Sequence, residues 1–179
     1  MTGKRLELLK DSIPGIVSVG VLVNPDVSYL PFEEDTRKAA QLLGLAVTFH
    51  QVREPTALDD AIHRMKAEGA QAVFVLPDVM FATEAKYIAD AALAERLPVM
   101  AWGSWFTELG CLMAYSADYE SLVRRLALYV DRILKGAQPG DLPIEQAARF
   151  ELSLNLRTAR IIGVAMSPEL LLRADKVIE

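Results

Sequence analysis

Two tryptophans that could contact a bound molecule, Trp102 and Trp105, stand three residues apart, directly after the apolar run LPVMA. They are the only tryptophans in the chain, and Phe106 follows them. Aromatic rings offer a flat apolar face, so this pattern favours stacking on a flat or apolar ligand. The alternative is that at least one ring fills the edge of a sheet or an interface between subunits.

Polar or aromatic side chains also follow other apolar runs. Asn24 follows VGVLV, Asp78 follows VFVLP, and Tyr115 ends CLMAY. With the aromatic residues of the 102–106 stretch they form the candidate ligand-binding set, in which Asn24 or Asp78 would hold a polar group such as an ammonium. Each also has a structural interpretation: Asn24 as a turn residue, Asp78 as a helix cap and Tyr115 as part of the core.

Catalytic and metal-binding patterns are absent from the sequence. It contains no G-x-S-x-G, no H-E-x-x-H and no cysteine–histidine pair. The lone cysteine, Cys111, lies in an apolar run and is predicted to be a small buried hydrophobe. His50 and His63 are too few to build a metal site with it. We therefore expect no enzyme activity, no metal and no cofactor.

Composition and charge narrow the choice of partners. Aspartate and glutamate outnumber lysine and arginine by 24 to 19, and no basic stripe is visible, which argues against nucleic acid. No apolar run approaches the roughly 20 residues that a membrane span needs. The N-terminal stretch has no export-signal pattern in the chain as given.

Short apolar runs alternate with segments of helical periodicity. This alternation predicts an α/β fold, namely a Rossmann-like parallel sheet with helices on both faces. In such sheets ligands bind beyond the carboxyl ends of the strands, which is where the candidate residues stand. The predicted strands cover residues 16–23, 46–52, 71–77, 97–102, 111–115 and 149–154.

Several helices have recognisable ends. Pro31 and Gly44 bound one of them. Thr56 with Asp59 resembles a capping box that begins a second. A third is predicted over residues 83–96, and two closing helices are predicted to begin near the end of the chain.

The strongest amphipathic helix covers residues 117–135. Ser116 is the predicted cap, and Gly136 is predicted to end it. Its large apolar residues form one stripe, made up of Tyr119, Leu122, Val123, Leu126, Val130, Ile133 and Leu134.

Three stretches resemble the ABC-transporter substrate-binding protein family, whose members have the type 1 periplasmic-binding fold. They are GKRLELLKDSIPGIVSVGVLVNP, the long block from LMAYSADYESLVRRL through RFELSLNLRTARIIG, and LLLRADKVIE. This resemblance implies two α/β lobes with the ligand between them. By analogy, residues 1–107 with 147–179 form the second lobe, and residues 108–146 are a strand and helix belonging to the first lobe, most of which is missing.

The resemblance also implies a function and partners. The chain is expected to be the solute-binding component of an ABC importer. This component would bind a small amino-acid-like, possibly aromatic molecule in the interlobe cleft, and a permease would recognise its closed form. The expected location is periplasmic or membrane-attached. A second copy is expected to cover residues 117–135. The alternatives are a homodimeric ligand-sensing or interaction domain and a small flavodoxin-like α/β enzyme.

The loop that carries the tryptophans departs from the family pattern. The family usually has an aromatic residue where Ala101 stands, and an Arg-Glu-Phe triplet in place of residues 104–106. The missing arginine puts carboxylate recognition by this loop in doubt, whereas the added tryptophans are consistent with a flat or apolar ligand.

Overall fold

The computed structural model describes residues 1–27, 30–147 and 149–179, and its centre is one seven-stranded sheet. The strands follow the order β2-β1-β3-β4-β5-β6-β7. Their bounds are β1 Ser18–Val23, β2 Ala46–Gln51, β3 Val73–Val75, β4 Val99–Ala101, β5 Met113–Ala117, β6 Phe150–Asn155 and β7 Lys176–Ile178.

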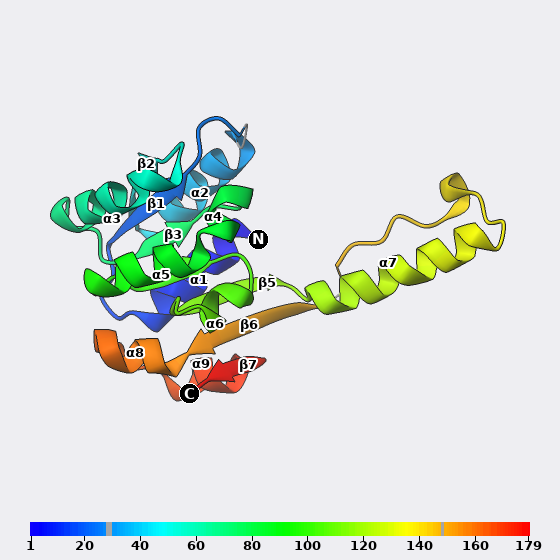
Figure 1. Cartoon of the computed structure of the whole chain (residues 1–179). Coiled ribbons are helices and arrows are strands. Elements are labelled where there is room, and N and C mark those ends of the chain that lie inside the picture. Colours follow the sequence, from blue (N-terminus) through cyan, green and yellow to red (C-terminus); the bar gives the residue numbers. More distant parts are fainter. Residues whose placement is uncertain (28–29, 148) are drawn as a thin grey trace.

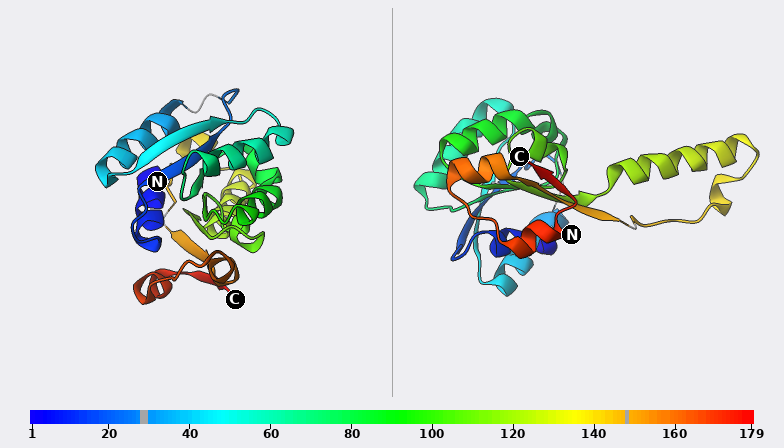
Figure 2. Two further views of the ribbon diagram at one scale, coloured as in Figure 1. Left: turned by 90° about the vertical axis from the view of Figure 1, so that its left-hand side faces the viewer. Right: turned by 90° about the horizontal axis from the view of Figure 1, so that it is seen from below.

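All strand pairs are parallel except β5 with β6, which run antiparallel. The helices cover both faces of the sheet (Figures 1 and 2). The predicted α/β class is therefore confirmed. The helices are α1 Thr2–Ser12, α2 Leu30–Leu43, α3 Leu58–Ala67, α4 Val79–Thr83, α5 Ala85–Ala94, α6 Trp105–Glu108, α7 Tyr119–Leu134, α8 Leu156–Ile162 and α9 Pro168–Arg173, with short 3-10 turns η1 Pro55–Ala57 and η2 Pro139–Asp141.

Two apolar clusters, one on each face, hold these layers together. The first joins α3, α4, α5 and α6 to the sheet, and the second joins α1, α2, α8 and α9 to the opposite face. Successive strand residues alternate between them, as Phe74 in the second cluster and Val75 in the first show. Strands buried on both faces need apolar residues at every position, which explains the continuous runs in the sequence. Cys111 is fully buried in the first cluster, as predicted.

Two predictions about local structure, both of helix caps, were wrong. Thr56 makes no cap; it lies inside η1, and α3 begins at Leu58 without a side-chain cap. The helix predicted over residues 83–96 is present as α5, with the short α4 directly before it. The cap of α7 is Asp118, which accepts a hydrogen bond from the backbone N–H of Ser121 at 3.0 Å, rather than Ser116.

The helix α7 and the segment that returns from it form an arm, residues 118–147, that projects from the sheet (Figure 1). No residue of α7 is buried. The strand before the arm, β5, falls within the range 108–146 that was assigned to another lobe, and it lies between β4 and β6 of this sheet. The division of the chain into lobes stays a prediction. Only the arm leaves the sheet, and its assignment to a first lobe stays a prediction.

Candidate functional site

The carboxyl ends of β1, β3 and β4 lie side by side at one edge of the sheet. The pairs Leu22↔Val75 and Phe74↔Met100 set their register. Three candidate residues come just after these ends, at positions 24, 78 and 102. The structure therefore places them at a common edge, whereas their contact with a ligand stays a prediction.

Asn24 and Asp78 form a buried polar pair at this edge. The Asn24 Nδ2 donates to the Asp78 Oδ2 at 3.3 Å, and the two side chains are 9% and 5% exposed. The other oxygen, Asp78 Oδ1, accepts from the backbone N–H of Met80 at 2.7 Å and of Phe81 at 3.3 Å, so Asp78 is the cap of α4. Asn24 Oδ1 accepts from the backbone N–H of Asp26 at 3.1 Å. The pair thus joins two strand ends 54 residues apart and fixes the geometry of the edge.

The aromatic residues after β4 form a cluster of rings. Trp102 and Trp105 meet edge to face, with ring centroids 5.0 Å apart and planes at 90°. Phe106 lies 5.8 Å from Trp102 and 5.6 Å from Trp105, and is fully buried. Tyr119, at the start of α7, adds a fourth ring 5.6 Å from Trp105. Both tryptophans remain partly exposed beside the first apolar cluster, so each offers ring surface at the edge.

Gly103 is required for this arrangement of rings. A Cβ at position 103 would come within 2.2 Å of the Trp105 ring. We therefore expect Gly103→Ala to displace the Trp105 ring from Trp102, and to lower the free energy of unfolding by about 1–3 kcal/mol through overpacking. Near-UV circular dichroism and intrinsic fluorescence would show the loss of the coupled indole signal.

Gly140→Ala is the matched control for this substitution. Its added Cβ would meet nothing within 4 Å, so both spectra should remain those of the wild type. Equal spectra for the two variants would show that the Trp105 ring tolerates a side chain at Gly103.

Tyr115 lies on the other face of the sheet from the tryptophans. Its ring belongs with the second apolar cluster and stacks on Phe150 at 5.8 Å, with 20° between the planes. Its backbone carbonyl accepts a hydrogen bond from Arg5 Nε at 2.8 Å. The structure therefore places Tyr115 and the aromatic cluster on opposite faces of the sheet.

Sequence reasoning missed Arg5, which is only 5% exposed in α1. A signal was present in the sequence. Arg5 precedes Leu8 by three residues and Leu9 by four, so it shares their face of the helix, and both leucines are buried. A cation at such a position must lie in or beside the core.

The described residues show no group of three or more His, Cys, Asp or Glu side chains placed to hold a metal ion. In the same part of the chain, no helix combines the length and the apolar character needed to cross a membrane.

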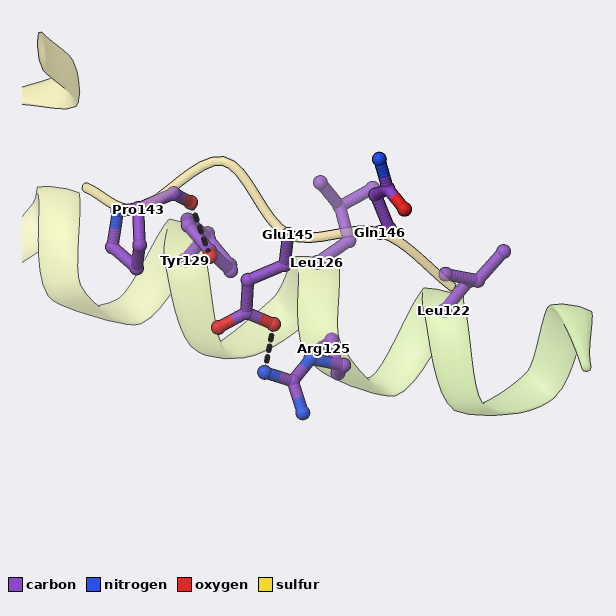
Figure 3. A pocket seen from close by; sticks show the side chains of 7 residues that line it. All are labelled: Leu122, Arg125, Leu126, Tyr129, Pro143, Glu145 and Gln146. Carbon is purple, nitrogen blue, oxygen red and sulfur yellow. Dashed lines mark hydrogen bonds and ion pairs between the residues drawn. The ribbon is translucent and has the colours of Figure 1, made fainter. Parts of the chain in front are cut away.

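A hollow of about 270 Å³ lies in the arm, between α7 and the returning segment (Figure 3). Arg125 forms an ion pair with Glu145, and the Tyr129 hydroxyl donates to the Pro143 carbonyl at 2.7 Å. These contacts hold the returning segment against one flank of the helix. The hollow contains none of the candidate residues from the sequence.

Comparison with solved structures shows the same fold. A conserved domain protein from Vibrio cholerae O1 biovar El Tor matches 98% of this chain at 23% identity, with a TM-score of 0.88. An ABC domain in complex with L-Trp from Streptococcus pneumoniae matches 99% at 21% identity, also with a TM-score of 0.88. An open, ligand-free substrate-binding protein with adhesive properties from Clostridium difficile matches 98% at 20% identity, with a TM-score of 0.68.

This chain spans only about 60% of the length of each of these structures. No curated protein matches it. The family model for ABC transporter substrate-binding proteins matches residues 1–178. Members of that family bind solutes and are not enzymes, which disfavours the flavodoxin-like enzyme. Because the match extends over almost all of its length, the chain belongs to the ABC transporter substrate-binding protein family.

Proposed function

We propose that this chain is part of the solute-binding component of an ABC importer and binds a small, amino-acid-like molecule at the carboxyl edge of its sheet. Residues 1–107 with 147–179 would be one lobe, in which β5 also lies. The cleft would form between this edge and a second lobe. Closure of the lobes about their hinge would trap the solute for recognition by a permease. Such a protein acts in the periplasm or attached to a membrane.

The observation that carries this proposal is the aromatic cluster at the carboxyl edge. It puts two partly exposed indole rings where open α/β sheets bind ligands. The buried Asn24–Asp78 pair beside it supplies polar atoms on a fixed support. The L-Trp bound by the S. pneumoniae protein supports an amino-acid-like ligand.

Intrinsic tryptophan fluorescence tests the proposal directly. Because the chain's two tryptophans lie in one loop, the signal reports on that loop alone. We expect a saturable shift on titration with one class of solute from a panel of amino acids and other small molecules. L-tryptophan would be titrated by calorimetry, since its own indole fluorescence overlaps the signal.

The variant Trp105→Phe keeps an aromatic ring and leaves Trp102 as the only reporter. A saturable shift that persists in this variant would place Trp102 next to the solute. If no solute shifts the signal or releases heat, and the blue-shifted spectrum reddens on dilution, the tryptophans lie between subunits and ligand binding at this edge is contradicted.

The exposed arm favours a second candidate, a homodimeric ligand-sensing or interaction domain. Burying a large apolar side chain stabilises a protein by about 1.5–3 kcal/mol, so this surface favours association. The apolar residues that α7 exposes are between 40% and 82% accessible, namely Tyr119, Val123, Leu126, Leu128, Val130, Ile133 and Leu134.

The charges of α7 fit pairing with a second copy. At 3.6 residues per turn, Glu120, Arg124, Asp131 and Lys135 share one flank beside the apolar stripe. In an antiparallel two-fold pair centred between residues 127 and 128, Glu120 faces Lys135 of the other copy, and Arg124 faces Asp131. This register also places Leu122 opposite Ile133. The proposed dimer therefore joins the arms through α7.

A further inference from the structure

The short helix α6, which carries Trp105 and Phe106, is not held in place by signals of its own. It has four residues, and the side chain of Ser104 at its start makes no capping hydrogen bond. A single helical turn fixes several backbone dihedrals for very few hydrogen bonds, so it is unstable in isolation. Contacts from the rest of the fold must therefore keep both rings where they are.

The first of these contacts comes from Ser153 on β6, which lies beside α6 (Figure 1). The Ser153 Oγ lies 2.6 Å from the Thr107 Oγ1, and both residues are fully buried. The Thr107 Oγ1 also lies 2.6 Å from the Ser104 carbonyl oxygen. A carbonyl only accepts and a hydroxyl carries one hydrogen, so Thr107 donates to Ser104 and Ser153 donates to Thr107. These two bonds form a chain from β6 to the start of α6.

The second contact comes from Asn155, at the end of the same strand. Its Nδ2 donates to the Thr107 carbonyl at 2.8 Å, and the residue is 4% exposed. Its Oδ1 accepts from the backbone N–H of Thr158 at 2.9 Å and thereby caps α8. Its own backbone N–H donates to the Leu112 carbonyl at 2.9 Å. Both polar atoms of the side-chain amide are thus used, one for each of two helices.

The contacts from β6 meet at Thr107, which directly follows Phe106. Because Trp105 belongs to the same turn and its ring lies 5.0 Å from that of Trp102, a shift of α6 would move one indole against the other. Buried hydrogen-bond networks rigidify the groups that they join when every member is satisfied. Ser153 and Asn155 therefore fix the position of the rings from behind, through Thr107.

We propose that Ser153 and Asn155 are positioning residues for solute binding, which hold α6 and its rings in the arrangement that meets the solute. The inference rests on the solute-binding function proposed above and adds two residues of β6 to that site. Rings that are held in place before binding lose less conformational freedom when the solute arrives, and this raises the affinity. The strand that returns from the arm thus influences the affinity for solute at the end of β4.

Ser153→Ala tests the inference, because it removes the donor to Thr107. Near-UV circular dichroism should lose part of the coupled signal of the two indoles, and acrylamide should quench their fluorescence more readily. Neither measurement needs a solute. In calorimetric titrations with the panel of amino acids, the affinity for the solute that binds the wild type should fall about twofold to tenfold, the range expected for one hydrogen bond.

Ser12→Ala is the matched control. The Ser12 Oγ donates to the Leu9 carbonyl at 2.8 Å, and Ser12 is 1% exposed. Leu9 belongs to the second apolar cluster, on the face of the sheet opposite α6. The control also loses a buried hydroxyl, so its stability should fall, whereas its indole signal, quenching and affinity should remain those of the wild type.

The route through Thr107 is tested by two other variants. Thr107→Val keeps the shape of the side chain and removes its hydroxyl, so adding Ser153→Ala to it should lower the affinity little further. Asn155→Asp keeps an oxygen for the cap of α8 but places a second oxygen against the Thr107 carbonyl. Its indole signal and affinity should fall at least as far as those of Ser153→Ala.

Wild-type indole signals and affinity in folded Ser153→Ala and Asn155→Asp would overturn the inference. An equal change in Ser12→Ala would also overturn it, since the rings would then report only a general loss of stability, and so would fully additive effects of Ser153→Ala and Thr107→Val. The proposed function is decided separately. A wild type that binds nothing from the panel would contradict solute binding and any role of these residues in affinity, while the circular dichroism would still show whether they hold the rings.

Discussion

The double variant Leu126→Asp, Val130→Asp is expected to sediment as a monomer of 19.7 kDa, whereas the wild type sediments at about twice that mass. Both residues lie in the apolar stripe of α7, and they are 63% and 49% exposed in the single chain. Aspartates in the centre of a helix pair would bury unpaired charges, which no dimer of this kind tolerates. Analytical ultracentrifugation over a range of concentrations measures the effect.

Leu42→Asp, Leu172→Asp is the matched control for this result. These leucines are 89% and 88% exposed on α2 and α9, so their replacement leaves α7 intact. The control should remain a dimer. A wild type that is monomeric at every concentration, or a control that dissociates as the α7 variant does, would contradict pairing through α7.

The second large effect is expected for Asp78→Ala, which should lower the free energy of unfolding by about 2–3 kcal/mol. The substitution removes the cap of α4 and the acceptor for Asn24 in one step. The backbone N–H of Phe81 is then left buried without a partner. Urea denaturation followed by far-UV circular dichroism measures the loss.

Two further variants show whether the burial of the Asn24–Asp78 pair causes the loss of stability expected for Asp78→Ala. Asp78→Asn keeps an oxygen for the helix cap but presents an amide N–H₂ to Asn24, so a smaller loss of about 1 kcal/mol is expected. Asp118→Ala removes the cap of α7 on the exposed arm and should cost less than Asp78→Ala. If Asp118→Ala destabilises the protein as much, capping alone accounts for the effect, and the buried pair with Asn24 contributes nothing.

Strands with both faces buried were predictable from the sequence, because they need an unbroken apolar run. All six predicted strands occur, whereas β7 was missed. It has three residues, Lys176–Ile178, and two of them are exposed, so no pattern marks it.

Local capping signals failed where longer-range structure competed with them. Pro55 begins η1 ahead of Thr56, and pairing with β6 extends β5 to Ala117, which moves the start of α7 past Ser116.

The position of the candidate site was also predictable, because residues that follow parallel strands meet at one edge. The pairing of Asn24 with Asp78 could not be predicted, because it depends on the register of β1 with β3, which no sequence pattern indicates. The separation of Tyr115 from the tryptophans depends on which strand residue faces which layer of helices. The burial of Arg5 follows from its place on the same helix face as Leu8 and Leu9, whereas its bond to the Tyr115 carbonyl required the structure.

The antiparallel pair β5–β6 gives the arm the mechanics of a lever. Beyond the last pair of β4 with β5, the two strands continue as a narrow ribbon from Tyr115↔Leu152 to Ala117↔Phe150. The 16 residues of α7 extend about 24 Å at 1.5 Å per residue. A bend of about 10° in the ribbon therefore displaces the tip of α7 by about 4 Å over that length. A small bend where β4 ends thus becomes a large movement at the far end of the arm, and a force on the tip acts on the same point as a bending moment.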